Sequence, residues 1–151
     1  MSQLKTWLEA FYLGCKVEIL PKIYEAQLKQ IPYSKLGTQK NYKDEPQYNA
    51  IGILEQVIGP IQRSKADAIG VISFTDVDLF TKNLSNYCFG YGIPALGGVQ
   101  SLRRFMPDFT GEDNDKETEE SLKLMRICKI ATHEIGHMFG LGHCIFYQCL
   151  M

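Results

Sequence analysis

All three histidines of this 151-residue chain lie in one short stretch near its C-terminal end. The stretch reads H-E-x-x-H-x-x-G-x-x-H and begins at His133. On an α-helix, His133 and His137 lie one turn apart on the same face, so both imidazoles can reach a single Zn²⁺. Gly140 can adopt the left-handed conformation that ends a helix, and the following turn would bring back His143 as a third ligand. Three protein ligands leave one position of a tetrahedral ion open, which is typical of catalytic sites.

Glu134 follows the first histidine and lies about 100° round the helix from it, where its carboxylate can face a metal-bound water. The motif therefore predicts one catalytic Zn²⁺ with Glu134 as the general base. Ordinary histidines of a packed helix are the alternative, but that reading does not explain why the chain has no histidine elsewhere. An oxygen-activating iron site is disfavoured, because such sites use two histidines and a carboxylate, and the third position here is His143.

The composition is that of a globular protein, with 45% hydrophobic and 22% charged residues and a formal net charge of -1. The length predicts a single domain over residues 1–151. Without a basic surplus we expect no nucleic-acid partner. Without a signal sequence or an apolar run of about 18 residues, we expect no membrane partner and a cytoplasmic or otherwise intracellular monomer.

Hydrophobic periodicity predicts a helix over residues 3–13, a strand over 15–20, a second helix over 48–63 and a buried strand over 68–74. Strand, helix and strand in this order indicate a right-handed βαβ unit. Asp76 and Asp78, which follow the buried strand, are more typical of a turn than of a cation site.

Residues 97–105 contain glycines among apolar residues and are expected to form an edge strand. A helix of about 22 residues, over 117–139, would carry the first two histidines and cross the domain. Such a rigid element suits ligands that must be held in a fixed geometry.

The residues after the third histidine narrow the interpretation further. Cys144 follows His143 directly, Cys149 lies five residues later, and Met151 is two residues beyond that. With the histidine motif, this spacing resembles the archaemetzincin (archaelysin) family of the metzincin clan of zinc peptidases. A weaker similarity reaches back to about residue 66.

The resemblance implies an α/β fold of the metzincin-like (zincin) type. Its twisted, mostly parallel sheet would have an antiparallel edge strand above the zinc and pack on helices that include the long zinc-binding helix. The resemblance also implies hydrolysis of peptide bonds, with an aminopeptidase-like preference for short, neutral peptides. The peptide backbone would then pair with the edge strand at Gly97, Gly98 and Val99.

The same resemblance implies that Met151 is the methionine of the turn beneath the catalytic zinc. It also implies that Cys144 and Cys149 are two of four thiolates on a second, structural zinc. The family's downstream C-x-x-C does not occur in residues 1–151, so we expect a C-terminally incomplete catalytic domain in which the second site is half formed. This truncation motivates the alternative function, a catalytically silent zinc-binding or interaction module.

Overall fold

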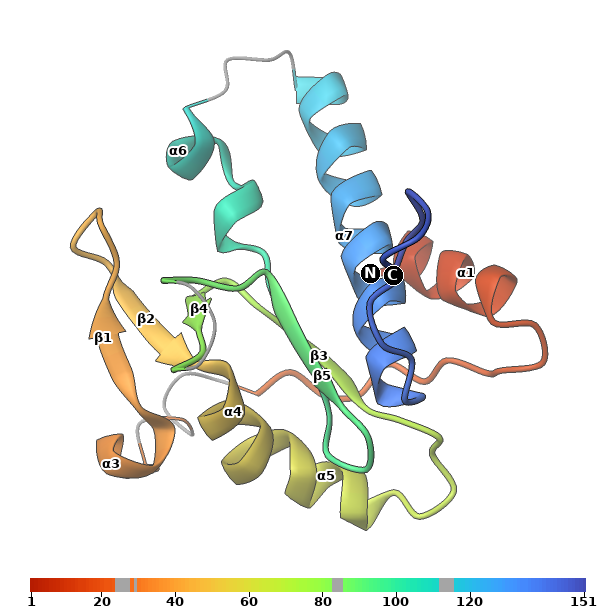
Figure 1. The fold of residues 1–151 in the computed structure, drawn as a ribbon, viewed down its shortest axis with the longest axis horizontal. Helices are drawn as coiled ribbons and strands as arrows, with labels where there is room; N and C mark the ends of the chain where they lie inside the picture. Colours follow the sequence, from red (N-terminus) through yellow and green to blue (C-terminus); the bar gives the residue numbers. More distant parts are fainter. Residues whose placement is uncertain (24–27, 29, 83–85, 112–115) are drawn as a thin grey trace.

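The computed structural model describes residues 1–23, 28, 30–82, 86–111 and 116–151. Figure 1 shows a mixed α/β arrangement, as predicted. In chain order the elements are α1 (Ser2–Phe11), α3 (Tyr33–Leu36), β1 (Thr38–Lys40), β2 (Pro46–Asn49), α4 (Ala50–Ile53), the π-helical turn η1 (Leu54–Ile58), α5 (Gly59–Ser64), β3 (Ile72–Thr75), β4 (Asp78–Phe80), β5 (Gly90–Ile93), β6 (Gly97–Ser101), the 3₁₀ turn η2 (Arg103–Phe105), α6 (Pro107–Thr110) and α7 (Lys116–Met138).

The described strands form two three-stranded sheets, with strand orders β1-β2-β4 and β3-β6-β5. In each sheet one pair is parallel and one is antiparallel. The expectation of one mostly parallel sheet is therefore wrong. The reason is that short turns join β1 to β2 and β5 to β6, and a short turn can connect only antiparallel neighbours.

The predicted βαβ unit is also wrong. Residues 15–20 form no strand, because the segment runs between two separate cores. Val17 packs on the cluster around Leu4 and Cys128, whereas Leu20 packs on the cluster around Leu54 and Val99. The strand that precedes the helical segment is β2, and it belongs to a different sheet from β3.

The strand at residues 97–101 is the centre of its sheet and not an edge. β6 pairs with β3 on one side and with β5 on the other, and all five of its residues are buried. Gly97, Gly98 and Val99 therefore have no free main-chain edge to offer a peptide, which corrects the predicted substrate-binding residues. The antiparallel edge strand of this sheet is β5.

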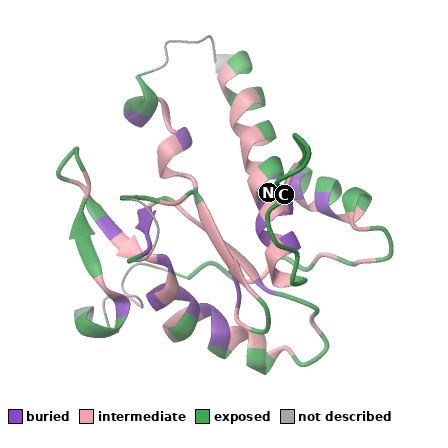
Figure 2. Cartoon of the chain, viewed as in Figure 1, coloured by how far each residue is buried: buried purple, intermediate pink, exposed green. Residues whose placement is uncertain are grey.

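The sheet β3-β6-β5 lies between two helical layers (Figure 1). On one face, Val99 and Tyr91 pack against the continuous helical segment formed by α4, η1 and α5. On the other face, Ile72 and Phe74 pack towards α7, and α1 covers α7 from outside. Figure 2 shows that the segment after α7 is mostly exposed. None of the described helices combines the length and the apolar character needed to cross a bilayer.

Candidate metal centre and active site

The C-terminal end of α7 stops at a left-handed glycine, as the motif predicts. Gly140 has a φ of +84°. The N–H of Gly140 donates to the carbonyl of His137 at 2.9 Å, and the N–H of Leu141 donates to the carbonyl of Gly136 at 3.0 Å. This pair of hydrogen bonds is the Schellman arrangement, which reverses the chain directly after a helix. The reversal brings His143 back beside the last turn of α7.

The three predicted ligands converge. Nε2 of His137 lies 3.0 Å from Nε2 of His133 and 3.2 Å from Nε2 of His143. One ligand atom from each ring can be chosen so that all three lie within 4.8 Å of one another. Zinc–nitrogen bonds of about 2.0–2.1 Å in a tetrahedron separate the ligand nitrogens by about 3.4 Å. The spacing therefore fits a zinc ion.

In two of the rings, Nδ1, the nitrogen on the side away from the centre, lies within hydrogen-bond distance of a main-chain carbonyl oxygen. Nδ1 of His133 is 2.6 Å from the carbonyl oxygen of Leu150, and Nδ1 of His137 is 2.8 Å from that of Leu141. When Nδ1–H donates to a carbonyl, the neutral ring presents an unprotonated Nε2 to the centre. Lone pairs that face one another at this distance repel unless a cation lies between them, so the donor set also fits Zn²⁺.

Burial lowers the pKa of His133, and its hydrogen bond to Leu150 opposes this shift. The neighbouring rings of His137 and His143 lower the pKa further. A lowered pKa favours the neutral imidazole, which is the form that binds a metal.

Glu134 lies on α7 next to this centre and its side chain is almost completely covered, with 5% exposure. Burial raises its pKa to about 7, while a hydrogen bond from the main-chain N–H of Gly92 on β5 acts in the opposite direction. A carboxylate with a raised pKa takes up a proton more readily, which is the property that a general base needs.

A cleft of about 360 Å³ opens beside the metal centre. Its walls combine the start of β5, one face of α7 and the C-terminal segment, with the lining residues Phe89, Gly90, Lys129, Ile130, His133, Glu134 and Leu150. The cleft thus places His133 and Glu134 at a solvent-accessible surface next to the edge strand.

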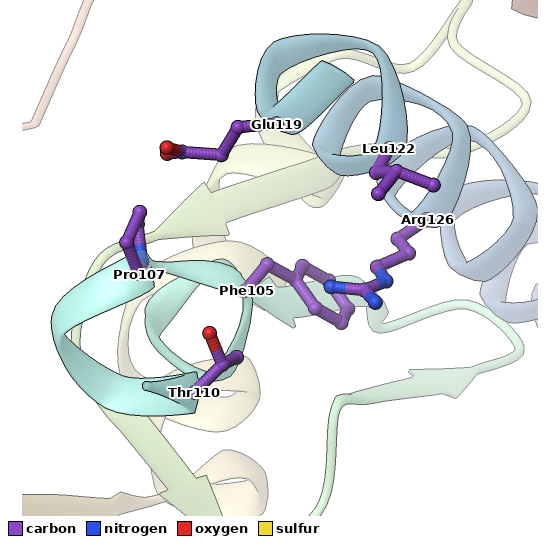
Figure 3. A pocket seen from close by; sticks show the side chains of 6 residues that line it. All are labelled: Phe105, Pro107, Thr110, Glu119, Leu122 and Arg126. Atoms are coloured by element: carbon purple, nitrogen blue, oxygen red, sulfur yellow. The ribbon is translucent and has the colours of Figure 1, made fainter. Parts of the chain in front are cut away.

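A second hollow, between η2–α6 and the start of α7, measures about 10 Å³ (Figure 3). That volume is about one water molecule, so this hollow cannot hold a peptide.

The remaining predicted residues also lie near the centre. Sδ of Met151 lies against Gly136, where a Cβ atom would come within 2.6 Å of it, and the carbonyl of Met151 accepts the N–H of Cys144 at 2.8 Å. The N–H groups of Phe146 and Tyr147 and the thiol of Cys149 lower the pKa of Cys144. The two thiols are therefore neighbours, but among the described residues the three-ligand cluster consists of the histidines alone.

Sequence reasoning missed four contributors to the centre. Leu141 and Leu150 act through carbonyl oxygens, which leave no signature in residue type. Gly92, with Gly90, brings β5 against Glu134. A glycine at every second position of a strand was the available signal, because alternate residues share one face.

The fold and the motif can be compared with known proteins. Residues 42–151 match the model of Peptidase family M54. An archaemetzincin-2 from Rattus norvegicus is 28% identical over 172 residues, which cover 98% of this chain and 45% of the rat protein. An archaemetzincin from Pyrococcus furiosus is 40% identical over 92 residues, which cover 60% of this chain and 45% of the relative. The chain thus spans somewhat less than half the length of these curated relatives.

Two crystal structures share the fold. A zinc-dependent peptidase from Methanocorpusculum labreanum superposes with a TM-score of 0.72 at 24% identity, covering 99% of this chain and 78% of the other. An archaemetzincin from Methanopyrus kandleri gives a TM-score of 0.62 at 28% identity, covering 99% and 68%. Because the family model matches most of the chain and includes the whole histidine motif, the protein belongs to Peptidase family M54, the archaemetzincin family that the spacing of its histidines and cysteines predicts.

Proposed function

We propose that this chain carries the catalytic centre of a zinc-dependent metallopeptidase. The observation that carries the proposal is the convergence of three Nε2 atoms beside the buried carboxylate of Glu134, at the wall of an open cleft. Membership of Peptidase family M54 supports the same conclusion.

The histidines and Glu134 have different tasks. His133, His137 and His143 would hold the ion, and hydrogen bonds from Nδ1–H to the carbonyls of Leu141 and Leu150 would keep two of the rings in the ligating tautomer. Bound Zn²⁺ supplies Lewis acidity, which lowers the pKa of water and polarises a carbonyl. The carboxylate of Glu134 takes a proton from the attacking water and passes it to the departing amine nitrogen.

We propose that β5 replaces β6 as the strand that receives the peptide. The N–H of Ser101 donates to the carbonyl of Phe89 at 2.8 Å, and Gly90 is registered with Gln100. In this antiparallel pairing, Phe89 and Tyr91 bond to β6, so the main-chain groups of Gly90 and Gly92 face the free edge. Gly92 N–H is already bound by Glu134. Gly90 therefore offers one donor and one acceptor for strand addition.

The cleft supports short peptides as substrates, because 360 Å³ is near the lower end of the usual range for ligand pockets, about 300–1,000 Å³. Support for an aminopeptidase-like preference is weaker. An aminopeptidase needs an acidic group to bind the charged amino terminus of its substrate, and the acidic group that lines this cleft is Glu134, the proposed base. Lys129, which also lines the cleft, would repel a free amino terminus. We therefore propose peptide hydrolysis without a requirement for that terminus.

We further propose that Cys144 and Cys149 contribute two thiolates to a second zinc site. Their proximity and the lowered pKa of Cys144 support this assignment. A tetrahedral structural site takes four ligands, so the remaining ones would come from elsewhere. Metal analysis of the wild type and of a Cys144→Ser variant tests the proposal, which fails if both bind the same number of zinc ions.

The central experiment compares the wild type with Glu134→Gln and His143→Ala against a broad peptide library, together with zinc content. We expect Glu134→Gln to keep its zinc and lose at least about 10²-fold in turnover. His143→Ala should lose affinity for zinc as well as activity. Zinc binding by a wild type that cleaves no peptide would favour the silent module, and undiminished turnover by Glu134→Gln would refute the role of the carboxylate.

A further inference from the structure

Strand β5 passes very close to Glu134 because two of its residues have no side chain. A Cβ atom on Gly90 would lie 2.6 Å from Oε1, 2.8 Å from Cδ and 2.7 Å from Cγ of Glu134. A Cβ atom on Gly92 would lie 2.3 Å from the main-chain oxygen of Glu134. Real Cβ atoms do not approach other heavy atoms this closely, so any side chain at either position requires something to move.

The two glycines share the face of β5 that is turned towards α7. Tyr91 and Ile93, which alternate with them, point the other way and pack against the core formed with α4 and η1. One face of the strand is thus an ordinary core surface, while the other is bare. That bare face lies over the residue that follows the first metal ligand.

The two positions differ in what a methyl group would strike. At Gly92 it would meet the helix backbone, so an alanine there must push β5 and α7 apart. At Gly90 the three nearest atoms that it would meet all belong to the side chain of Glu134, which can rotate away. An alanine at Gly90 is therefore able to displace the carboxylate while the fold around it stays in place.

We infer that Gly90 is a positioning residue for Glu134. Its missing side chain leaves the space in which the carboxylate lies, and the main-chain N–H of Gly92 binds the carboxylate there. This inference rests on the proposed function, because the carboxylate so placed is the proposed base. Gly90 acts on the reaction through Glu134 and makes no contact with the metal ligands in this role.

A kinetic double-mutant cycle tests the inference, with the zinc-loaded wild type, Gly90→Ala, Glu134→Gln and the double variant. Misplacing a reacting group by about 1 Å can lower a rate by about 10²-fold, so we expect a loss of that order in kcat for Gly90→Ala. We expect the same alanine to change nothing further in the Glu134→Gln background. Zinc affinity should stay within about threefold of the wild type, because no histidine moves.

A matched control is Gly142→Ala, which adds a methyl group where no heavy atom outside the two neighbouring residues of the chain lies within 4 Å. It should retain the activity and zinc affinity of the wild type. Gly90 is not a positioning residue if Gly90→Ala turns over like the wild type, if it loses the same factor in both backgrounds, or if it loses zinc.

A second cycle needs no activity. In urea unfolding of the metal-free protein, Gly90→Ala should lower the midpoint in the wild-type background and leave it unchanged in a Glu134→Ala background, where the space is vacated. Equal shifts in the two backgrounds would show that Glu134 is not what occupies the space over Gly90. A wild type without hydrolytic activity would refute the proposed function. This second cycle would still test whether the side chain of Glu134 fills the space beside Gly90.

Discussion

Replacing Glu134 by glutamine should make the metal-free protein more stable, and more so at high pH. Burial at 5% exposure raises the pKa of Glu134 from 4.5 to about 7. The folded chain therefore binds this proton more tightly than the unfolded chain, so stability is lost as the pH rises from about 4.5 to about 7. At about 1.4 kcal/mol for each pH unit, the full loss is about 3 kcal/mol, of which about 2.5 kcal/mol develops between pH 5 and pH 8.5.

The assay is urea unfolding of both proteins in the presence of a chelator, at pH 5 and at pH 8.5. Glutamine does not titrate, so the difference in unfolding free energy between Glu134→Gln and the wild type should shift by about 2.5 kcal/mol in favour of the variant. His133, whose pKa is lowered, loses its contribution to stability as the pH falls. This effect is present in both proteins and cancels in the difference.

The exposed Glu120, on the same helix, provides the control: Glu120→Gln replaces a carboxylate by an amide without uncovering a buried group. Its difference from the wild type should be the same at both pH values. If the Glu134→Gln difference were equally constant, the carboxylate would not be desolvated, and the reasoning that connects its burial to its basicity would fail.

Three further predictions concern the metal, the helix end and a buried ion pair. Zinc at 100 times its dissociation constant should add about 2.7 kcal/mol of stability, a gain that a chelator reverses and that His143→Ala lacks in thermal melts. Gly140→Ala, at a φ of +84°, should cost about 1–2 kcal/mol and weaken zinc binding in calorimetric titrations, because His143 follows this turn. Arg104→Met leaves the fully buried Asp78 without its bidentate partner and should cost about 3–5 kcal/mol in urea unfolding.

Each of these three has a plain contrary result. An unchanged melting temperature on adding zinc would show that the three histidines do not bind this metal. A Gly140→Ala variant with normal zinc affinity would show that the turn does not place His143. As a control for Arg104→Met, Lys40→Met breaks the exposed pair with Asp44 and should change the unfolding free energy by less than about 1 kcal/mol. Equal effects of these two changes would mean that burial is not decisive.

The metal ligands and the base could be predicted from the sequence because the relations among them are local. Residues four apart share a helix face whatever the rest of the chain does, so His133 and His137 were paired by spacing alone. Gly140 could be assigned to the helix end because only glycine adopts the left-handed conformation without strain. The long helix α7 follows from periodicity, which is also local, whereas the α/β class of the fold was expected from the family resemblance.

The edge strand and the surroundings of Glu134 were decided by tertiary structure. Glycine-containing strands at 90–93 and 97–101 look equally suited to an edge, and only pairing between distant segments makes β6 central and β5 an edge strand of its sheet. Asp78 was interpreted as a turn residue because its partner Arg104 is remote in sequence. The packing of the Glu134 side chain against Gly90 likewise depends on residues that are far apart in the chain. Local residue types define the ligand set, whereas contacts between remote segments define where its base can lie.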